Sequence, residues 1–174
     1  MKILVIRHGV NRSEDFIDLG LTPKGKVQAE TLARKLQPLG VKRIYASPSL
    51  RAKETAEIIA RDIKAEIIFL PSLRSVSVDI GKVGKENLTK KNWIDNFPGF
   101  ESPNDFIKRT KMAIKKILRE HGQQETILLV GHEETLWAMW KIFALPKIDF
   151  SDIVEMEVAH CDPQIFILTK ENVA

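Results

Sequence analysis

The chain of 174 residues has a single cysteine, Cys161, so no disulfide bond can form within it and a cysteine-based metal site is excluded. Cys161 stands beside the turn signal Asp162-Pro163 and is interpreted as a structural thiol. Long hydrophobic runs are also missing. The N-terminal apolar run stops at Arg7, which is too early for a signal peptide, and no stretch is long enough to span a bilayer. We therefore expect a cytoplasmic protein with no membrane partner.

The sequence also lacks the signatures of several binding functions. No G-x-G-x-x-G pattern follows the first apolar run, which argues against a dinucleotide-binding domain. The lysines and arginines are scattered, without a basic arm or a basic stripe interleaved with aromatic residues, so nucleic acid is not expected as a partner. The net charge of +4 instead favours anionic ligands in general.

Apolar runs and helical periodicities alternate along the chain. Runs rich in Ile, Leu and Val predict buried strands at 3–6, 44–46, 67–69 and 126–130. Capping residues and apolar stripes predict helices from 23 to about 40, from about 49 to 63, from 102 past 117, and from 133 to about 145. Residues 10–20 are interpreted as a polar loop, and 154–158 and 165–168 as two final strands that can pair as a hairpin. This order predicts an α/β fold, a three-layer α/β/α sandwich with a mixed, mostly parallel sheet, in a single domain of residues 1–174.

The segment from residue 71 to residue 103 breaks the periodicity. It contains glycines, several lysines, and the apolar residues Trp93, Phe97 and Phe100. Irregular segments of this length inside a compact domain are usually functional or mobile. We interpret 71–103 as a lid over the binding crevice; the alternative is a surface excursion with its own small apolar cluster.

Charged and imidazole side chains follow three of the predicted strands directly. Arg7-His8-Gly9 follows the first strand, Ser47-Pro48-Ser49-Leu50-Arg51 the second, and Gly131-His132-Glu133 the strand at 126–130. The carboxyl ends of parallel strands form the crevice in which α/β proteins bind ligands. Two histidines and two arginines gathered there suit a phosphoryl group, because arginine binds phosphate oxygens bidentately and a neutral imidazole can attack phosphorus.

The same residues resemble the motifs of a known family. Arg7-His8-Gly9 is similar to the R-H-G signature of the histidine phosphatase superfamily, the phosphoglycerate mutase-like proteins, and Val130-Gly131-His132 to its second-histidine motif. Three intervening segments also match, in the family's order: 21–29, 45–56, and 98–102 with Arg109 beyond it. The resemblance implies that His8 is the nucleophile, that Arg7, Arg51 and His132 complete the phosphate pocket, and that no metal or other cofactor is needed.

The chain departs from the family pattern in its proton donor. The family commonly carries a glutamate after the third strand in an L-x-E pattern, whereas here Leu73-Arg74 is followed by Ser75. Two residues are candidates for the donor, Glu133 and Asp79. Glu133 directly follows His132, where another branch of the superfamily carries an acidic donor, and we favour it. The third possibility is that no dedicated acid exists, as in small phosphohistidine phosphatases.

The remaining polar residues near these motifs have less defined roles. Val10-Asn11 replaces the usual acidic-hydroxyl pair after R-H-G, and Asn11 and Ser13 can still donate to a phosphate. His121 is interpreted as a cation at a helix end, and His160 as a loop residue.

The leading functional hypothesis is a phosphatase that hydrolyses small anionic phosphomonoesters through a phosphohistidine on His8. A phosphoglycerate mutase-type phosphoryl transferase is the nearest alternative, although mutases of this family are typically longer chains. A phosphohistidine-protein phosphatase is the third enzymatic hypothesis, and the absence of the L-x-E glutamate favours it. A non-catalytic phospho-ligand binder is the alternative outside enzymes.

Overall fold

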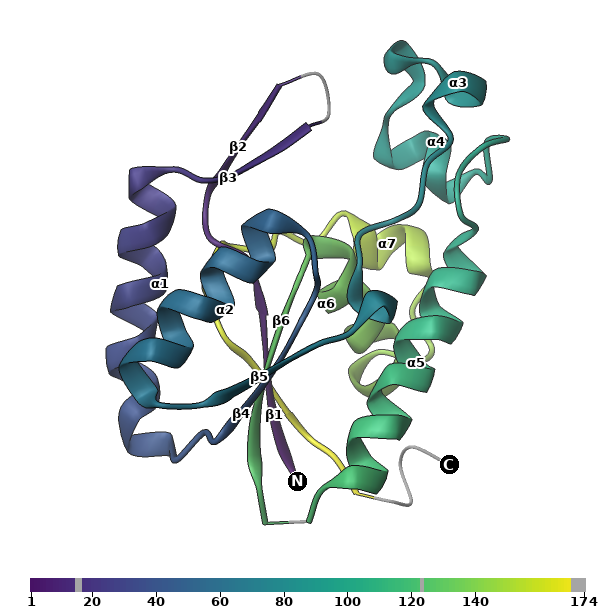
Figure 1. Cartoon of the computed structure of the whole chain (residues 1–174). Coiled ribbons are helices and arrows are strands. Elements are labelled where there is room, and N and C mark those ends of the chain that lie inside the picture. The colour runs from purple at the N-terminus through teal and green to yellow at the C-terminus, as the bar shows by residue number, and fades with distance from the viewer. Residues whose placement is uncertain (15–16, 123, 170–174) are drawn as a thin grey trace.

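Five strands form one sheet in the order β5-β4-β6-β1-β7 (Figure 1). Their bounds are Lys2–Arg7 (β1), Arg43–Ala46 (β4), Glu66–Phe69 (β5), Thr126–Gly131 (β6) and Gln164–Ile167 (β7). Strands β1, β4, β5 and β6 run parallel, and β7 pairs antiparallel with β1. The structure is a computed structural model and describes residues 1–14, 17–122 and 124–169.

Helices cover both faces of this sheet (Figure 1). On one face lie α1 (Pro23–Leu36), which a 3-10 turn at Gln37–Leu39 (η1) extends, and α2 (Leu50–Ile63). On the other face lie α5 (Pro103–Glu120), α6 (Glu133–Met139), which continues as a π-helical turn at Trp140–Ala144 (η4), and α7 (Phe150–Val154). The predicted three-layer α/β/α fold with a mixed, mostly parallel sheet is confirmed.

The alternation of side chains along β1 joins the sheet to both helical layers. Ile3 and Val5 pack into the cluster under α5 and α6, while Leu4 and Ile6 pack into the cluster under α1 and α2. All four side chains are almost fully buried. A strand buried on both faces reads as a continuous apolar run, as observed here. The first residues after the run therefore meet the crevice at the carboxyl edge.

Two predicted segments differ in the structure. Most of the predicted loop at 10–20 is strand: β2 (Asn11–Glu14) and β3 (Ile17–Leu21) pair antiparallel and are called the β2–β3 hairpin below, while residues 15–16 lie outside the described part of the chain. Residues 154–158 are not a strand, because α7 ends at Val154 and Val158 lies in irregular chain. The buried Ile153 and Val154 follow Phe150 at helical spacing, which favours one helical turn over an extended strand. The strand predicted at 165–168 is present as β7, but it pairs with β1 rather than in a hairpin.

The segment 71–103 consists of four short helical pieces (Figure 1). They are η2 (Pro71–Leu73), α3 (Ile80–Val83), η3 (Lys85–Asn87) and α4 (Lys90–Ile94). Trp93 anchors the segment: its ring is buried between Phe106 and Trp137, and its Nε1 donates to the Glu101 carbonyl at 2.9 Å. That this segment acts as a lid stays a prediction. Among the described residues, no helix is long and apolar enough to cross a membrane.

Arg109 on α5 ties both ends of this segment together. Its guanidinium binds both carboxylate oxygens of Glu101, at 2.6 and 2.8 Å, and donates to the backbone carbonyls of Ser72, Arg74 and Ser75. All five contacts use the planar fork of one side chain, which a lysine cannot reproduce.

Replacing Arg109 with alanine is expected to lower the free energy of unfolding by about 2 kcal/mol or more. The change removes the cation from the largely buried Glu101 carboxylate, which among the described residues keeps only the Ser77 amide as a donor, and it removes the donor of three backbone carbonyls. Arg109→Lys should recover only part of this loss. Urea denaturation measures the effect, and proteolysis should cut the alanine variant within 71–103 first. Equal stability of wild type and alanine variant would contradict this role.

Candidate active site

A cavity of about 270 Å³ opens at the carboxyl edge of β1, β4 and β6. The cavity is lined by two histidines, two arginines, two glutamates and two polar hairpin residues: Arg7, His8, Asn11, Ser13, Arg51, His132, Glu133 and Glu134. The structure thus brings together every predicted site residue except Asp79, and it adds Glu134.

The imidazole of His8 is held in one orientation. Its Nδ1 lies 2.8 Å from the carbonyl oxygen of Gly9, and its Nε2 lies 3.0 Å from Nε of Arg51. A carbonyl only accepts and a guanidinium only donates, so the proton is on Nδ1 and the lone pair is on Nε2. Burial lowers the pKa of His8 to about 3, and the charges of Arg51 and Arg7 act in the same direction. A neutral imidazole with its Nε2 lone pair toward the cavity is the form that can act as a nucleophile.

Two glycines allow the loop after β1 to meet the start of α1. A Cβ atom on Gly9 would come within 2.6 Å of the Gly25 carbonyl oxygen, and a Cβ on Gly25 would collide with the Val10 carbonyl. Thr22 caps α1 by accepting from the Gly25 amide at 3.0 Å, and its hydroxyl donates to the Val10 carbonyl. The two segments that resemble family motifs therefore lock together, and this contact fixes where His8 leaves the strand.

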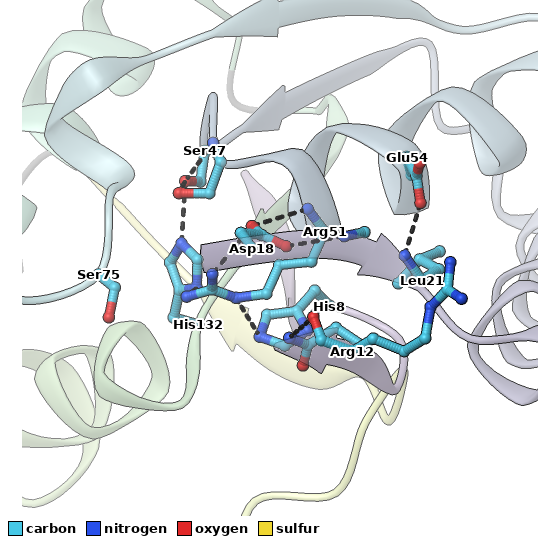
Figure 2. A network of polar contacts seen from close by, with 12 residues as sticks. His8, Arg12, Asp18, Leu21, Ser47, Arg51, Glu54, Ser75 and His132 are labelled. Atoms are coloured by element: carbon cyan, nitrogen blue, oxygen red, sulfur yellow. Dashed lines mark hydrogen bonds and ion pairs between the residues drawn. The ribbon is translucent and has the colours of Figure 1, made fainter. Parts of the chain in front are cut away.

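Arg51 joins the two histidines in the first turn of α2 (Figure 2). Its Nε donates to Nε2 of His8, and its second terminal nitrogen lies 3.1 Å from Nδ1 of His132. The third guanidinium nitrogen pairs with Asp18 at 2.9 Å. Asp18 lies on the β2–β3 hairpin and also accepts the backbone amide of Arg51 at 3.1 Å. Asp18 was not a predicted site residue, because residues 10–20 showed no strand pattern.

His132 is almost fully buried at the N-terminus of α6. Because Arg51 can only donate to Nδ1, the proton is on Nε2, which donates to the Ser47 hydroxyl at 2.9 Å. Burial holds the pKa of His132 well below its usual range, with Arg51 and His8 acting in the same direction. The rings of His8 and His132 are 5.3 Å apart, so both face one ligand position.

Arg7 and Glu133 form an ion pair on the other side of His8. The terminal nitrogen of Arg7 lies 3.2 Å from Oε1 of Glu133 and 3.1 Å from the Val158 carbonyl. Lys90, on α4 of the 71–103 segment, lies 3.8 Å from the same Oε1. Burial raises the pKa of Glu133, and the charges of Arg7 and Lys90 oppose this rise.

The remaining predicted residues differ in position. Asn11 and Ser13 line the cavity from the hairpin. Asp79 does not reach it: its half-exposed carboxylate pairs with Lys82 at 3.4 Å at the start of α3. A hydrogen bond from the Asp79 amide to Gly99 holds that stretch of the segment in place.

The other two histidines lie where the sequence interpretation placed them, His160 in the chain between α7 and β7 and His121 at the C-terminal end of α5, and tertiary contacts engage both. His160 lies beside the site, with its ring 5.5 Å from that of His8, because the chain before β7 pairs with Arg7. His121 is buried, with the Tyr45 hydroxyl at 2.7 Å and the Glu125 carboxylate at 2.8 Å.

The buried neutral histidines are expected to make folding sensitive to acid. An unfolded histidine titrates near 6.5 and His8 near 3, so below pH 6.5 the unfolded chain binds more protons than the folded one. The stabilisation is complete above pH 6.5 and is lost as the pH falls toward 3, by about 1.4 kcal/mol per pH unit for each such histidine. Urea denaturation of wild type and His8→Asn between pH 7 and 4 should show the variant losing less stability. Parallel curves would contradict a neutral His8.

Comparisons with known proteins identify the family of the chain. The model of the histidine phosphatase superfamily (branch 1) matches residues 3–172. The chain belongs to this superfamily. It is 26% identical over 200 residues to phosphoserine phosphatase 1 of Hydrogenobacter thermophilus, a match that covers 99% of this chain and 92% of that protein. It is 30% identical over 150 residues to the Escherichia coli protein named "Probable phosphoglycerate mutase GpmB", covering 76% of this chain and 69% of the relative.

The fold has a solved counterpart as well. The crystal structure of phosphoserine phosphatase from Entamoeba histolytica in complex with 3-phosphoglyceric acid superimposes with a TM-score of 0.72. The match covers 95% of this chain and 90% of that chain, at 20% sequence identity. At this identity the likeness establishes the shared α/β fold. Relatives of this superfamily member thus include both proteins named as phosphatases and proteins named as mutases.

Proposed function

We propose that the chain is a metal-independent phosphatase that hydrolyses small phosphomonoesters through a phosphohistidine on His8. The observation that carries the proposal is the state of His8: neutral, oriented by Gly9, and with its Nε2 lone pair facing a cavity lined by Arg7, Arg51 and His132. A sequence relative and a solved structure that are both named phosphoserine phosphatase support phosphomonoester hydrolysis as the reaction class.

The reaction has two steps in this site. Nε2 of His8 attacks phosphorus, and the bond between phosphorus and the ester oxygen breaks, leaving its electron pair on that oxygen, which takes a proton. Water then attacks the phosphohistidine, the P–N bond breaks, and its electron pair returns to Nε2 as phosphate leaves. Arg7 and Arg51 bind the phosphoryl oxygens in both steps, because fixed donors stabilise the negative charge that develops there. His132 donates to the same oxygens when its ring proton is on Nδ1, with Nε2 then accepting from the Ser47 hydroxyl. When the phosphoryl group binds, it displaces the hydrogen bond between Nε of Arg51 and Nε2 of His8, so that Nε2 contacts phosphorus instead.

A substrate panel separates hydrolysis from the alternatives. We expect release of inorganic phosphate from small phosphomonoesters, with no requirement for 2,3-bisphosphoglycerate. Interconversion of phosphoglycerate isomers that depends on the bisphosphate would favour the mutase, as the likeness to GpmB does. If the only substrate dephosphorylated is a phosphohistidine protein, the chain is a phosphohistidine-protein phosphatase. Tight binding of phosphorylated compounds without any turnover would favour a phospho-ligand binder.

Activity is expected to survive a chelator and to be inhibited by vanadate. The cations of Arg7, Arg51 and Lys90 make the cavity unfavourable for a divalent metal ion, and the phosphoryl-binding groups match the oxygens of vanadate. Phosphate release with and without excess EDTA tests this expectation. Activity lost in EDTA and restored by one specific metal ion would contradict it.

A further inference from the structure

The proposed hydrolysis leaves one chemical requirement unassigned. An alkyl phosphomonoester leaves as an alkoxide unless an acid protonates the ester oxygen, whereas an aryl ester leaves readily without help. Among the described residues that line the cavity, the carboxyl groups are those of Glu133 and Glu134. These two neighbours in the first turn of α6 are therefore the candidate proton donors for an alkyl ester.

The contacts of Glu133 are with two cations. Its Oε1 is shared by two cations, at 3.2 Å from Arg7 and 3.8 Å from Lys90. A proton on Glu133 would remove the charge that holds both cations. Burial favours the protonated form, but a donor role would break the pair that orients Arg7 toward the cavity. The ion pair makes Glu133 a positioning residue for Arg7.

The partner of Glu134 is uncharged. The Ser75 hydroxyl donates to Oε1 of Glu134 at 2.8 Å, although the two residues are 59 positions apart in the chain. Ser75 is itself fixed, because its carbonyl accepts from Arg109 at 3.0 Å. In Figure 2, Ser75 lies on the His132 side of Arg51, away from the hairpin residues Arg12 and Leu21. The Ser75 hydroxyl thus holds one oxygen of Glu134 at the cavity wall, which leaves the other oxygen as the atom that would carry a proton.

The two carboxyl groups also influence each other. The charge of Glu134 disfavours the ionised form of Glu133, so the two groups interact at close range. The cations of Arg7 and Lys90 are engaged with Glu133, so Glu134 is the lining carboxyl group that can pass a proton to a ligand without breaking an ion pair with them.

We propose that Glu134 is the catalytic acid that protonates the leaving oxygen of alkyl phosphomonoesters, and that Ser75 positions it. The assignment rests on the proposed phosphatase function. In the first step the proton moves from Glu134 to the ester oxygen as the P–O bond breaks. In the second step the Glu134 carboxylate takes a proton from the water that attacks the phosphohistidine, which restores the acid. This replaces our sequence-based preference for Glu133.

The test compares an alkyl ester, glycerol 2-phosphate, with an aryl ester, 4-nitrophenyl phosphate, in matched variants. Glu134→Gln should lower kcat/KM at least about 100-fold on the alkyl ester and less than about fivefold on the aryl ester. Glu133→Gln should lower both esters by similar factors, because it disturbs Arg7 in either case. Retained aryl turnover also shows that the Glu134 variant is folded.

Three further variants examine Ser75. Ser75→Ala should lose about tenfold on the alkyl ester alone, and Ser75→Thr, which keeps the hydroxyl, should restore it. The double variant Ser75→Glu with Glu134→Gln returns a carboxyl group to the same wall and should recover alkyl turnover.

The outcomes separate this assignment from the proposed function. An alkyl-selective loss in Glu134→Gln supports the assignment. Wild-type rates on both esters in Glu134→Gln, equal losses on both, or an alkyl-selective loss in Glu133→Gln instead, overturn it while the phosphatase function stands. A wild-type protein that hydrolyses neither ester overturns the proposed function and the assignment with it.

Discussion

Replacing His8 with alanine is expected to lower kcat on any phosphomonoester by at least about a thousandfold. Removal of a nucleophile leaves only the catalysis that substrate binding and charge stabilisation provide. His8 is buried directly after β1 and lines the cavity, so its imidazole is held where it can meet the phosphorus of a bound ester. Steady-state phosphate release measures the effect.

His160→Ala is the matched control for this variant. Its ring lies 5.5 Å from that of His8, but it is not among the residues that line the cavity. We expect a loss of less than about tenfold. A His8 variant with near-wild-type turnover, or a His160 variant as damaged as the His8 variant, would contradict the proposed role of His8.

Replacing Arg51 with lysine is expected to lower kcat/KM at least about tenfold even though the charge is kept. One guanidinium contacts His8, His132 and Asp18 through three different nitrogens, and the single nitrogen of lysine can serve only one of these positions. Charge-assisted contacts of this kind are worth about 1.5–3 kcal/mol each. The loss should be larger for Arg51→Ala.

Arg43→Lys controls for the general effect of exchanging an arginine. Arg43 begins β4, at the opposite end of the strand from the cavity, and its pair with Glu66 at 3.7 Å is solvent-exposed. Exposed pairs contribute about 1 kcal/mol or less, so this variant should keep wild-type kinetics. Equal kinetics of the Arg51 and Arg43 variants would show that Arg51 is only a surface cation.

The sequence predicted the strand ends better than the loops between them. An Ile/Leu/Val run followed at once by Arg7-His8 can be interpreted locally, because both the burial and the edge position follow from the residues themselves. The β2–β3 hairpin lacks such a pattern: residues 11–14 are all polar, so the pairing depends on contacts elsewhere in the fold. Because the hairpin was not predicted, Asp18 was not predicted as a partner of Arg51 either.

Local sequence patterns also could not predict which distant residues the chain topology places beside the site. His160 reaches His8 only because the chain before β7 returns alongside β1, and Ser75 reaches Glu134 only across 59 residues. The two candidate acids illustrate the limit further. Sequence adjacency to His132 made Glu133 the natural choice, while the ion pairs that distinguish it from Glu134 are tertiary contacts.

The central claim is that a covalent phosphohistidine forms on His8, and a rapid-quench experiment with a ³²P-labelled aryl phosphomonoester tests it most directly. Within the first turnover we expect label on the protein, up to about one phosphoryl group per chain, that is stable in alkali, released by acid, and located on His8 after proteolysis. The His8→Ala protein should carry none. Hydrolysis by the wild-type protein without any labelled intermediate, or label that maps to another residue, would show that His8 is not the nucleophile.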